Sequence, residues 1–306
     1  MSFAHTRAGL LDIKITFQCN NLCRFCIAGD KRRKWPDPCA ADLIKALESN
    51  RPACGTVIFS GGEPTVRPDL PDLIRAARAC GYKHVMVQSN GRRMAYPGYA
   101  DALLDAGADQ FSISLHGHKA ALHEYLTARP GSFGETVLGI RNLAGRGAHV
   151  ATNTVITRSS CHSLPDIARL IAHLGATQMQ FAYPHLDGKA RAHVRSIAPR
   201  MELMMPALAR AVDSAGDVPV LTEGIPACIL GPYADHASER APLRLCIADF
   251  STDGIIPDFK KHRIETLRDK GPDCPACRLF NACEGPWADY PEFFGWEEFR
   301  PVAAES

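Results

Sequence analysis

FQCNNLCRFCIAG, residues 17–29, places three cysteines within eight positions, at Cys19, Cys23 and Cys26. The stretch follows DIKITF (12–17), whose β-branched residues predict a strand. In a reducing compartment, clustered cysteines are expected to be metal ligands or catalytic thiols before they are disulfides. The stretch therefore predicts a metal or redox site in the loop after the first strand.

Charge and hydropathy limit the possible partners of this chain. The formal net charge is +2, which gives no electrostatic indication of a nucleic-acid partner. The sequence has no run of 18 apolar residues, and its N-terminus lacks the apolar core and cleavage site of a signal peptide. We therefore expect a soluble, cytoplasmic protein with neither a nucleic-acid nor a membrane partner.

Short β-rich runs alternate with longer helical patterns in the first part of the chain. The runs lie at 12–17, 56–60, 84–89, 110–115, 150–157 and 179–183, and apolar residues recur at helical spacing between them. This repeat predicts an α/β fold with a parallel sheet covered by helices. Six units are fewer than the eight of a closed barrel, so we expect a partial (β/α)6 barrel over 1–216. Its active site should lie in the loops at the carboxyl ends of the strands.

The alternation of strand and helix patterns stops in the last part of the chain, which we expect to form a small module over 217–306. A β-hairpin is predicted from 243–250 and 255–259. A second cysteine group follows, spaced C-x2-C-x5-C within DCPACRLFNACEG (273–285). A segment with so little apolar core is expected to need a metal centre for its stability.

Three interpretations of the first cysteine group are open. A structural zinc site would need a fourth ligand, which the second cysteine group would have to supply. A thiol-redox pair would use only C-x2-C and would leave Cys19 without a role. A [4Fe-4S] cluster suits three thiolates in a compact loop, with one iron left open for a substrate or cofactor.

A second motif distinguishes among these interpretations. The first group reads C-x3-C-x-aromatic-C, with Phe25 as the aromatic residue, and GGEP (61–64) follows the second predicted strand. Together the motifs resemble the radical S-adenosylmethionine (SAM) superfamily. The resemblance implies a [4Fe-4S] cluster on the three cysteines, with SAM bound to the open iron. It also implies a 5′-deoxyadenosyl radical that abstracts hydrogen from a substrate, and an electron donor of flavodoxin or ferredoxin type.

The same resemblance assigns residues to SAM. The loop FSGGEPT (59–65) resembles the one that binds the methionine ammonium, where glycine lets the backbone approach a ligand. Asn90 and Ser114 lie where the family places groups near the carboxylate and the ribose. Asn153 is a further ribose candidate, and Phe181 either flanks the adenine or packs in the core. The expected SAM residues are Phe25, Gly61, Gly62, Glu63, Asn90, Ser114, Asn153 and Phe181.

The second cysteine group resembles the shortened auxiliary-cluster module, called twitch, that follows many radical SAM barrels. This resemblance implies a second, auxiliary [4Fe-4S] cluster, and a structural zinc is the alternative. Five cysteines are available for four irons. We expect the ligands to be Cys228, Cys274, Cys277 and Cys283, which leaves Cys246 as a spare thiol beside the barrel mouth. Two alternatives stay open: Cys246 is itself a ligand, or Cys283 is the spare thiol.

The spare thiol bears on the reaction class. A thiol at Cys246 would be catalytic if it returned a hydrogen atom to the opposite face of the substrate radical, which is an epimerisation. Loss of an electron to the auxiliary cluster would instead give a dehydrogenation. The spare cysteine therefore favours inversion of a carbon centre.

The tail of the chain bears on the substrate. Residues 284–306 carry six acids and one base, close to Trp287, Tyr290 and Trp296, a combination that suits an amino sugar. A solvated tail packed on the barrel is the alternative. Only 11 residues precede the first predicted strand, which favours a small substrate over a leader peptide.

These features resemble the radical SAM enzymes of aminoglycoside biosynthesis, and among them the neomycin C epimerase-like enzymes. We therefore expect an epimerase that acts on an aminoglycoside-like carbohydrate. A dehydrogenase of an aminocyclitol or sugar alcohol and a peptide-modifying maturase are alternatives within the superfamily. A zinc-bound interaction module without catalysis is an alternative of a different class.

Overall fold

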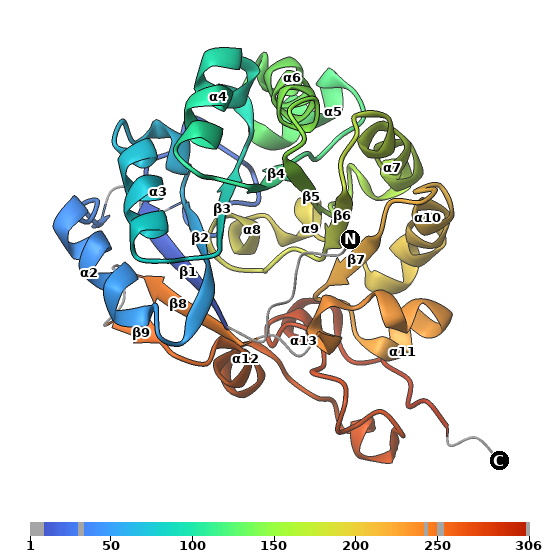
Figure 1. The fold of residues 1–306 in the computed structure, drawn as a ribbon. Helices are drawn as coiled ribbons and strands as arrows, with labels where there is room; N and C mark the ends of the chain where they lie inside the picture. The colour runs from blue at the N-terminus through green and yellow to red at the C-terminus, as the bar shows by residue number, and fades with distance from the viewer. Residues whose placement is uncertain (1–8, 30–33, 242–243, 250–253, 304–306) are drawn as a thin grey trace.

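The computed structural model describes residues 9–29, 34–241, 244–249 and 254–303, which build a nine-stranded sheet of order β7-β6-β5-β4-β3-β2-β1-β8-β9. Neighbouring strands are parallel from β7 to β8, and β9 is antiparallel to β8. The strands follow an arc with the longer helices on its outer side (Figure 1). They are β1 (Gly9–Thr16), β2 (Cys54–Gly61), β3 (His84–Ser89), β4 (Gln110–Ser114), β5 (His149–Val155), β6 (Gln178–Ala182), β7 (Val220–Glu223), β8 (Leu245–Asp249) and β9 (Gly254–Ile256).

Helices connect successive strands from β1 to β7, as parallel pairing requires. The longer ones are α2 (Ala40–Asn50), α3 (Leu70–Ala79), α4 (Pro97–Asp105), α5 (Ala120–Thr127), α6 (Ser132–Ala144), α7 (Leu164–His173) and α10 (Met201–Asp213). The short ones are α8 (Gly188–Ala192), α9 (Val194–Ile197), α11 (Ala227–Leu230), α12 (Phe259–His262) and α13 (Tyr290–Phe294). Proline in the first turn helps to start α3, α4 and α7. Within the described ranges, none of the helices has the length and apolar character needed to cross a bilayer.

The two faces of the sheet differ in character. On the outer face, Leu11, Ile13 and Ile15 of β1 are fully buried in the core that the helices cover. Successive side chains of a strand point to opposite faces, so the residues between them line the inner face. The strand register aligns polar side chains there, namely Asp12, Lys14, Ser60, Gln88, Ser112, Ser114, Asn153, Gln180 and Glu223. Most of them keep some solvent exposure, whereas branched apolar side chains fill the interior of a closed barrel.

The predicted parallel α/β fold is confirmed, and the six expected strands correspond to β1 to β6. The sequence pattern missed β7, because its four residues are too short to show a period. The predicted hairpin forms β8 and β9, although its turn at 250–253 lies outside the described residues. Residues after 216 do not stand apart from the barrel, because β7 pairs with β6 and β8 pairs with β1.

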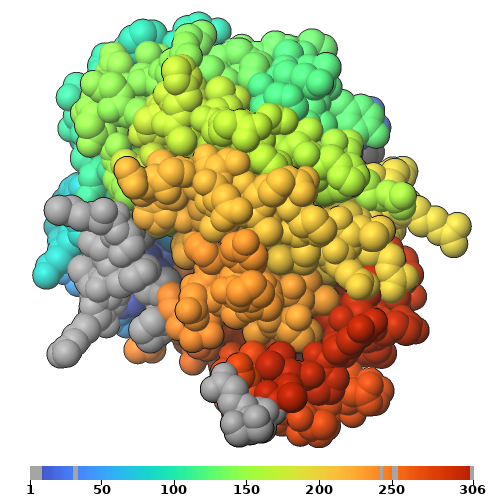
Figure 2. All heavy atoms as spheres, turned by 90° about the vertical axis from the view of Figure 1, so that its right-hand side faces the viewer, coloured from blue at the N-terminus to red at the C-terminus, as the bar shows by residue number. Residues whose placement is uncertain are grey.

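The C-terminal segment packs firmly on the barrel. Trp287 and Tyr290 are almost fully buried, so their rings are not available to stack on a sugar as the tail composition suggested. Glu298 has a side chain only 1% exposed, pairs with Arg200 and accepts a hydrogen bond from the backbone N–H of Glu202 at 3.0 Å. Figure 2 shows the red atoms of this segment against the yellow and orange atoms of the preceding helices. The buried side chains of the tail therefore fasten it to the barrel, and we call this contact the clamp.

We expect Glu298→Gln to lower the free energy of unfolding by roughly 1–3 kcal/mol, because it removes a charge-assisted hydrogen bond from a buried site. Chemical denaturation of the metal-free protein measures the change. The neighbouring Glu297 is exposed, and Glu297→Gln should change the stability little. Equal stability of the two variants would contradict the clamp.

Candidate functional site

The first cysteine group lies in the loop 17–29, directly after β1. Its backbone is held by the last turn of α5, whose carbonyl groups have no partner within the helix. The N–H groups of Leu22 and Arg24 donate to the carbonyls of Thr127 and Leu126, at 3.0 and 2.9 Å. The guanidinium of Arg24 bonds the carbonyl of Tyr125 at 2.8 Å and stacks on its ring. All three cysteines of the loop are partly exposed thiols.

The glycine motif pairs with the beginning of this loop. The N–H of Gly62 donates to the carbonyl of Thr16 at 2.7 Å, and the N–H of Glu63 donates to that of Gln18 at 2.8 Å. A Cβ on Gly62 would lie 2.6 Å from the carbonyl oxygen of Phe17 and closer still to that of Gln18. Gly61 has a φ of +127°, a conformation that other residues rarely adopt. Glycine is therefore needed here so that the two backbones can touch.

Glu63 joins this motif to the next strand. Its carboxylate is 1% exposed and accepts hydrogen bonds from the Thr65 N–H (3.1 Å) and hydroxyl (2.6 Å), the Ser89 hydroxyl (2.7 Å) and the Asn90 N–H (2.7 Å). Burial raises the pKa of Glu63, and these hydrogen bonds oppose the rise. Its side chain therefore links the ends of β2 and β3, and we call this link the Glu63 bracket.

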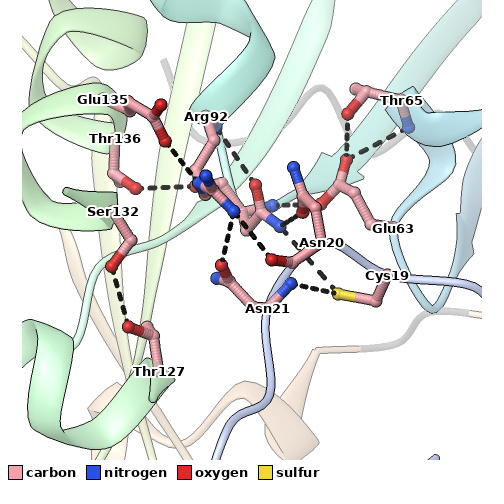
Figure 3. Close-up of polar contacts among 12 residues, drawn as sticks. Cys19, Asn20, Asn21, Glu63, Thr65, Arg92, Thr127, Ser132, Glu135 and Thr136 are labelled. Carbon is pink, nitrogen blue, oxygen red and sulfur yellow. Dashed lines mark hydrogen bonds and ion pairs between the residues drawn. The ribbon is translucent and has the colours of Figure 1, made fainter. Parts of the chain in front are cut away.

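A polar network, drawn in Figure 3, carries this bracket on to the cysteine loop. The Nδ2 of Asn90 donates to the Oδ1 of Asn20 at 2.6 Å and lies 4.0 Å from the sulfur of Cys19. Arg92 bonds the carbonyl of Asn20 at 2.8 Å and pairs with Glu135 on α6. Asn90 was expected at this site from the sequence, whereas Arg92 and Glu135 were not. The only available signal was the position of Arg92 directly after QSNG (88–91).

A second support for the cysteine loop is aromatic. Phe25 packs edge-on against His116, which follows β4, with ring centroids 4.8 Å apart. His116 accepts a hydrogen bond from the N–H of Val155, and His123 accepts one from the N–H of His116, both at 3.2 Å. Burial lowers the pKa of His116 to about 3 and that of His123 to about 4. Both imidazoles are therefore neutral at pH 7.

The ribose candidates lie side by side on the inner face. Ser114 of β4 is the register partner of Asn153 of β5, and Gln180 of β6 is the next partner along. The Oδ1 atom of Asn153 is buried without a hydrogen-bond partner, as a group awaiting a hydroxyl donor would be. Phe181 does not join them. It points to the outer face and is fully buried in the core, so the expected contact with adenine is replaced by the core-packing alternative.

The second cysteine group gathers around one pocket. Cys228, in α11 shortly after β7, lies beside Cys274, Cys277 and Cys283, and all four thiols line the pocket together with Phe299 and Arg300 from the tail. Burial and the three neighbouring thiols raise the pKa of Cys228 to about 12. In the described part of the chain no three ligand side chains converge on a single metal ion. Thiols spread around a pocket instead suit a cubane, which takes one thiolate at each iron.

Backbone N–H groups already point at two of these sulfurs. Gly285 donates to the Sγ of Cys283 at 3.4 Å, and Val302 donates to the Sγ of Cys277 at 3.3 Å. In the first group, Asn21 donates to the Sγ of Cys19 at 3.4 Å. Such bonds stabilise thiolates and tune iron–sulfur clusters, so both groups fit the cofactors that the motifs imply.

Cys246 lies apart from both groups, which corrects its expected position beside the barrel mouth. It pairs in register with Leu11, near the start of β1, and shares the outer face with it. Its side chain is buried, donates to the carbonyl of Pro257 at 3.0 Å and adjoins Cys54. A thiol on this face, away from the carboxyl ends of the strands, is not placed to return a hydrogen atom to a substrate there.

Comparison with known proteins agrees with this geometry. The family model for the radical SAM superfamily matches residues 13–171, which is just over half of the chain. The protein belongs to the radical SAM superfamily. Membership implies a [4Fe-4S] cluster and SAM, which when bound supply the 5′-deoxyadenosyl radical. The residues of this chain support them by bracing the cysteine loop, through the Gly62 contact, the Glu63 bracket and the Arg92 ion pair.

Curated radical SAM relatives match over part of their length. An AdoMet-dependent heme synthase of Nitratidesulfovibrio vulgaris is 34% identical over 169 residues, which cover 55% of this chain and 46% of the relative. The mycofactocin maturase MftC of Mycobacterium tuberculosis is 35% identical over 173 residues, covering 54% of this chain and 42% of the relative. The matched regions thus span less than half the length of these two relatives.

Solved radical SAM structures match over most of the chain. Streptococcus suis SuiB bound to S-adenosylmethionine aligns with a TM-score of 0.69 at 16% identity, covering 91% of this chain and 72% of SuiB. The enzyme anSMEcpe with bound AdoMet aligns with a TM-score of 0.64 at 14% identity, covering 98% of this chain and 92% of the other. At these identities the likeness shows a shared fold.

Gly62→Ala should detach the glycine motif from the cysteine loop, because the added methyl group would collide with two carbonyl oxygens. We expect the variant to lose the iron of the first site, about four atoms, together with SAM binding. Iron analysis and equilibrium dialysis with SAM after anaerobic reconstitution measure both. A Cβ at Gly98 of α4 meets nothing within 4 Å, so Gly98→Ala serves as the control. Full iron content in Gly62→Ala would contradict the contact.

The buried imidazoles predict a loss of stability in mild acid. Their pKa values in the folded state are depressed, so below about pH 6.5 the unfolded chain binds protons that the folded chain does not. Each imidazole should lower the free energy of unfolding by roughly 1.4 kcal/mol at pH 5.5. Urea titrations of the metal-free protein at pH 7.5 and 5.5 test this.

In His123→Gln the difference between the two pH values should shrink by the contribution of one imidazole. His173 is exposed on α7, and His173→Gln is the control for the loss of one histidine. The same pH dependence in His123→Gln and in the wild-type protein would refute the assignment.

Proposed function

We propose that this radical SAM enzyme dehydrogenates a small, polar, amine-bearing carbohydrate or aminocyclitol. The observation that carries the proposal is the arrangement of the second cysteine group. Four thiols surround one pocket close to the end of β7, while Cys246 faces away from the inner face of the sheet. A fully ligated auxiliary [4Fe-4S] cluster, when bound there, supplies an electron acceptor for the substrate radical.

The inner face of the sheet supports a small polar substrate. Ser112, Gln88 and Lys14 keep solvent exposure there, where a closed barrel has apolar packing. Hydroxyl and amide groups in such a position can orient a hydroxyl-rich ring through hydrogen bonds. The loop after β1, which holds the first cysteine group, lies at the same edge as the carboxyl ends of the other strands. A substrate on this face would therefore lie next to SAM.

Inversion of a carbon centre is less well supported than dehydrogenation. Epimerisation of an aminoglycoside-like carbohydrate would need a hydrogen donor on the inner face. The thiol expected in that role, Cys246, is buried on the outer face beside Cys54. The alternative ligand assignments, with Cys246 bound to the cluster or Cys283 free, are also disfavoured, because Cys283 lines the pocket and Cys246 does not.

Peptide modification is the second candidate. It is favoured by the 35% identity to the maturase MftC and by the shared fold with SuiB, which has been crystallised with its precursor peptide SuiA. The two candidates differ in the substrate that the inner face would accept. A precursor peptide encoded beside the gene for this protein, and bound by it, would favour the second.

An anaerobic assay in D2O with SAM, a flavodoxin-type reductant and candidate aminoglycosides tests the proposal. We expect a product oxidised by two electrons, with 5′-deoxyadenosine formed in equal amount. An inverted carbon that carries one solvent deuterium would establish epimerisation and overturn the dehydrogenation. Turnover of a precursor peptide alone would establish the maturase.

The ligand set makes a separate prediction. Cys228→Ala and Cys274→Ala should each lose the auxiliary cluster, about four irons, whereas Cys246→Ala should keep about eight. Iron and sulfide analysis after anaerobic reconstitution measures the difference. Cys54→Ala is the matched control, because its thiol is a buried neighbour of Cys246 on the outer face. Loss of about four irons in Cys246→Ala would show that the ligand set is wrong.

A further inference from the structure

The seam between the barrel and the C-terminal segment holds a group of charged side chains that the cofactors do not account for. Arg268, with a side chain 1% exposed, bonds Glu239 at 2.5 Å and stacks on Trp287 at 3.6 Å. Arg263 pairs with both oxygens of Glu284, at 2.7 and 2.8 Å. The Nε of Arg268 also lies 3.9 Å from Glu284, so the two arginines are paired with these two carboxylates.

Glu223 is the third carboxylate of this group and differs from the other two. It lies at the end of β7, on the inner face, and its carboxylate accepts a hydrogen bond from the neutral amide of Gln180 at 2.7 Å. Burial raises the pKa of Glu223, Glu239 raises it further, and the two arginines oppose the rise. Burial also lowers the pKa of His185, whose ring packs on Trp287, to about 4, so that imidazole brings no positive charge.

The charges of this group do not balance. Glu223, Glu239 and Glu284 face Arg263 and Arg268, which leaves one negative charge without a cation among these five residues. Lys260 bonds the backbone carbonyl of Glu239 and not a carboxylate. Both arginines act on Glu223 electrostatically, but they form their ion pairs with Glu284 and Glu239. A cation supplied by a ligand would therefore further stabilise the ionised carboxylate of Glu223.

The position of Glu223 shows which ligand could supply the cation. The residues assigned to the cluster and SAM come from the ends of β1 to β5. Gln180 and Glu223 lie on the inner face of β6 and β7, the next strands in the sheet order, and Cys228 of the pocket follows β7 shortly in the chain. A substrate that lies next to SAM and close to that pocket would reach this part of the sheet.

We propose that Glu223 binds a protonated primary amine of the substrate and that Gln180 holds the carboxylate in position for it. This inference rests on the proposed function, because it assigns the substrate to the inner face of the same sheet. The amine can belong to an amino sugar or aminocyclitol, or to the lysine side chain of a peptide. Both sources share the ammonium group, and the amino sugar is the one that agrees with the polar inner face.

Binding to the reconstituted holoenzyme with SAM, without reductant, tests the proposal. The probes are neamine, tetra-N-acetylneamine, which keeps the rings but loses the charges, and Nα-acetyl-lysine amide. Isothermal titration should show that the wild-type protein prefers neamine to its acetylated form. Glu223→Gln should weaken neamine binding about 10- to 100-fold and leave the binding of the acetylated form unchanged.

Two further variants keep the test decisive. Glu48 is exposed on α2, and Glu48→Gln should bind neamine as the wild-type protein does. Gln180→Met keeps the charge of Glu223 but removes the amide that orients it, and should weaken neamine binding about 3- to 10-fold. This second variant reports on the site even if Glu223→Gln fails to fold.

The outcomes separate this proposal from the proposed function. Equal neamine binding by Glu223→Gln and the wild-type protein, or no preference of the wild-type protein for the charged probe, would overturn the role of Glu223. Iron content and SAM cleavage would then still stand on their own. Preference for the lysine probe over neamine would keep Glu223 as the amine site and assign it to a peptide substrate.

Discussion

The first site depends on one close approach between two backbones. Gly62 lies against the carbonyls of Phe17 and Gln18, with no room for a Cβ, and this contact aligns the glycine motif with the loop of Cys19. The Glu63 carboxylate can then reach the end of β3, from which Asn90 extends to the cysteine loop. The hydrogen bond from Asn90 to the cysteine loop therefore depends on that contact.

Different strands of the sheet carry different parts of the candidate site. Strands β1 to β5 carry the ribose candidates and lead into groups that hold the cysteine loop, and β6 and β7 carry Gln180 and Glu223. Cys228 follows β7 closely in the chain and lines one pocket with Cys274, Cys277 and Cys283, which come after β9. Because the inner face is polar and partly exposed, a hydrophilic substrate can occupy the space that apolar side chains fill in a closed barrel.

Phe181 and Cys246 were both expected at the active site, and they differ in whether the sequence carried a signal against that position. Successive side chains of a strand point to opposite faces, so Phe181 lies on the same face as the apolar Met179, and Gln180 between them points to the inner face. This alternation already favoured core packing for Phe181. The position of Cys246 had no such signal, because the pairing of β8 with β1 joins segments more than 230 residues apart. The partner strand decided the face on which that thiol lies.

The sequence by itself determined the first cysteine group, the glycine motif and the repeated βα order, because these depend on local spacing and on period. Only the tertiary structure decided which four cysteines share a pocket, that Arg92 and Glu135 brace the cysteine loop, and that the two arginines near Glu223 form their ion pairs with other carboxylates. Those facts depend on contacts between distant segments. Sequence spacing carries no record of such contacts, because folding alone brings the side chains together.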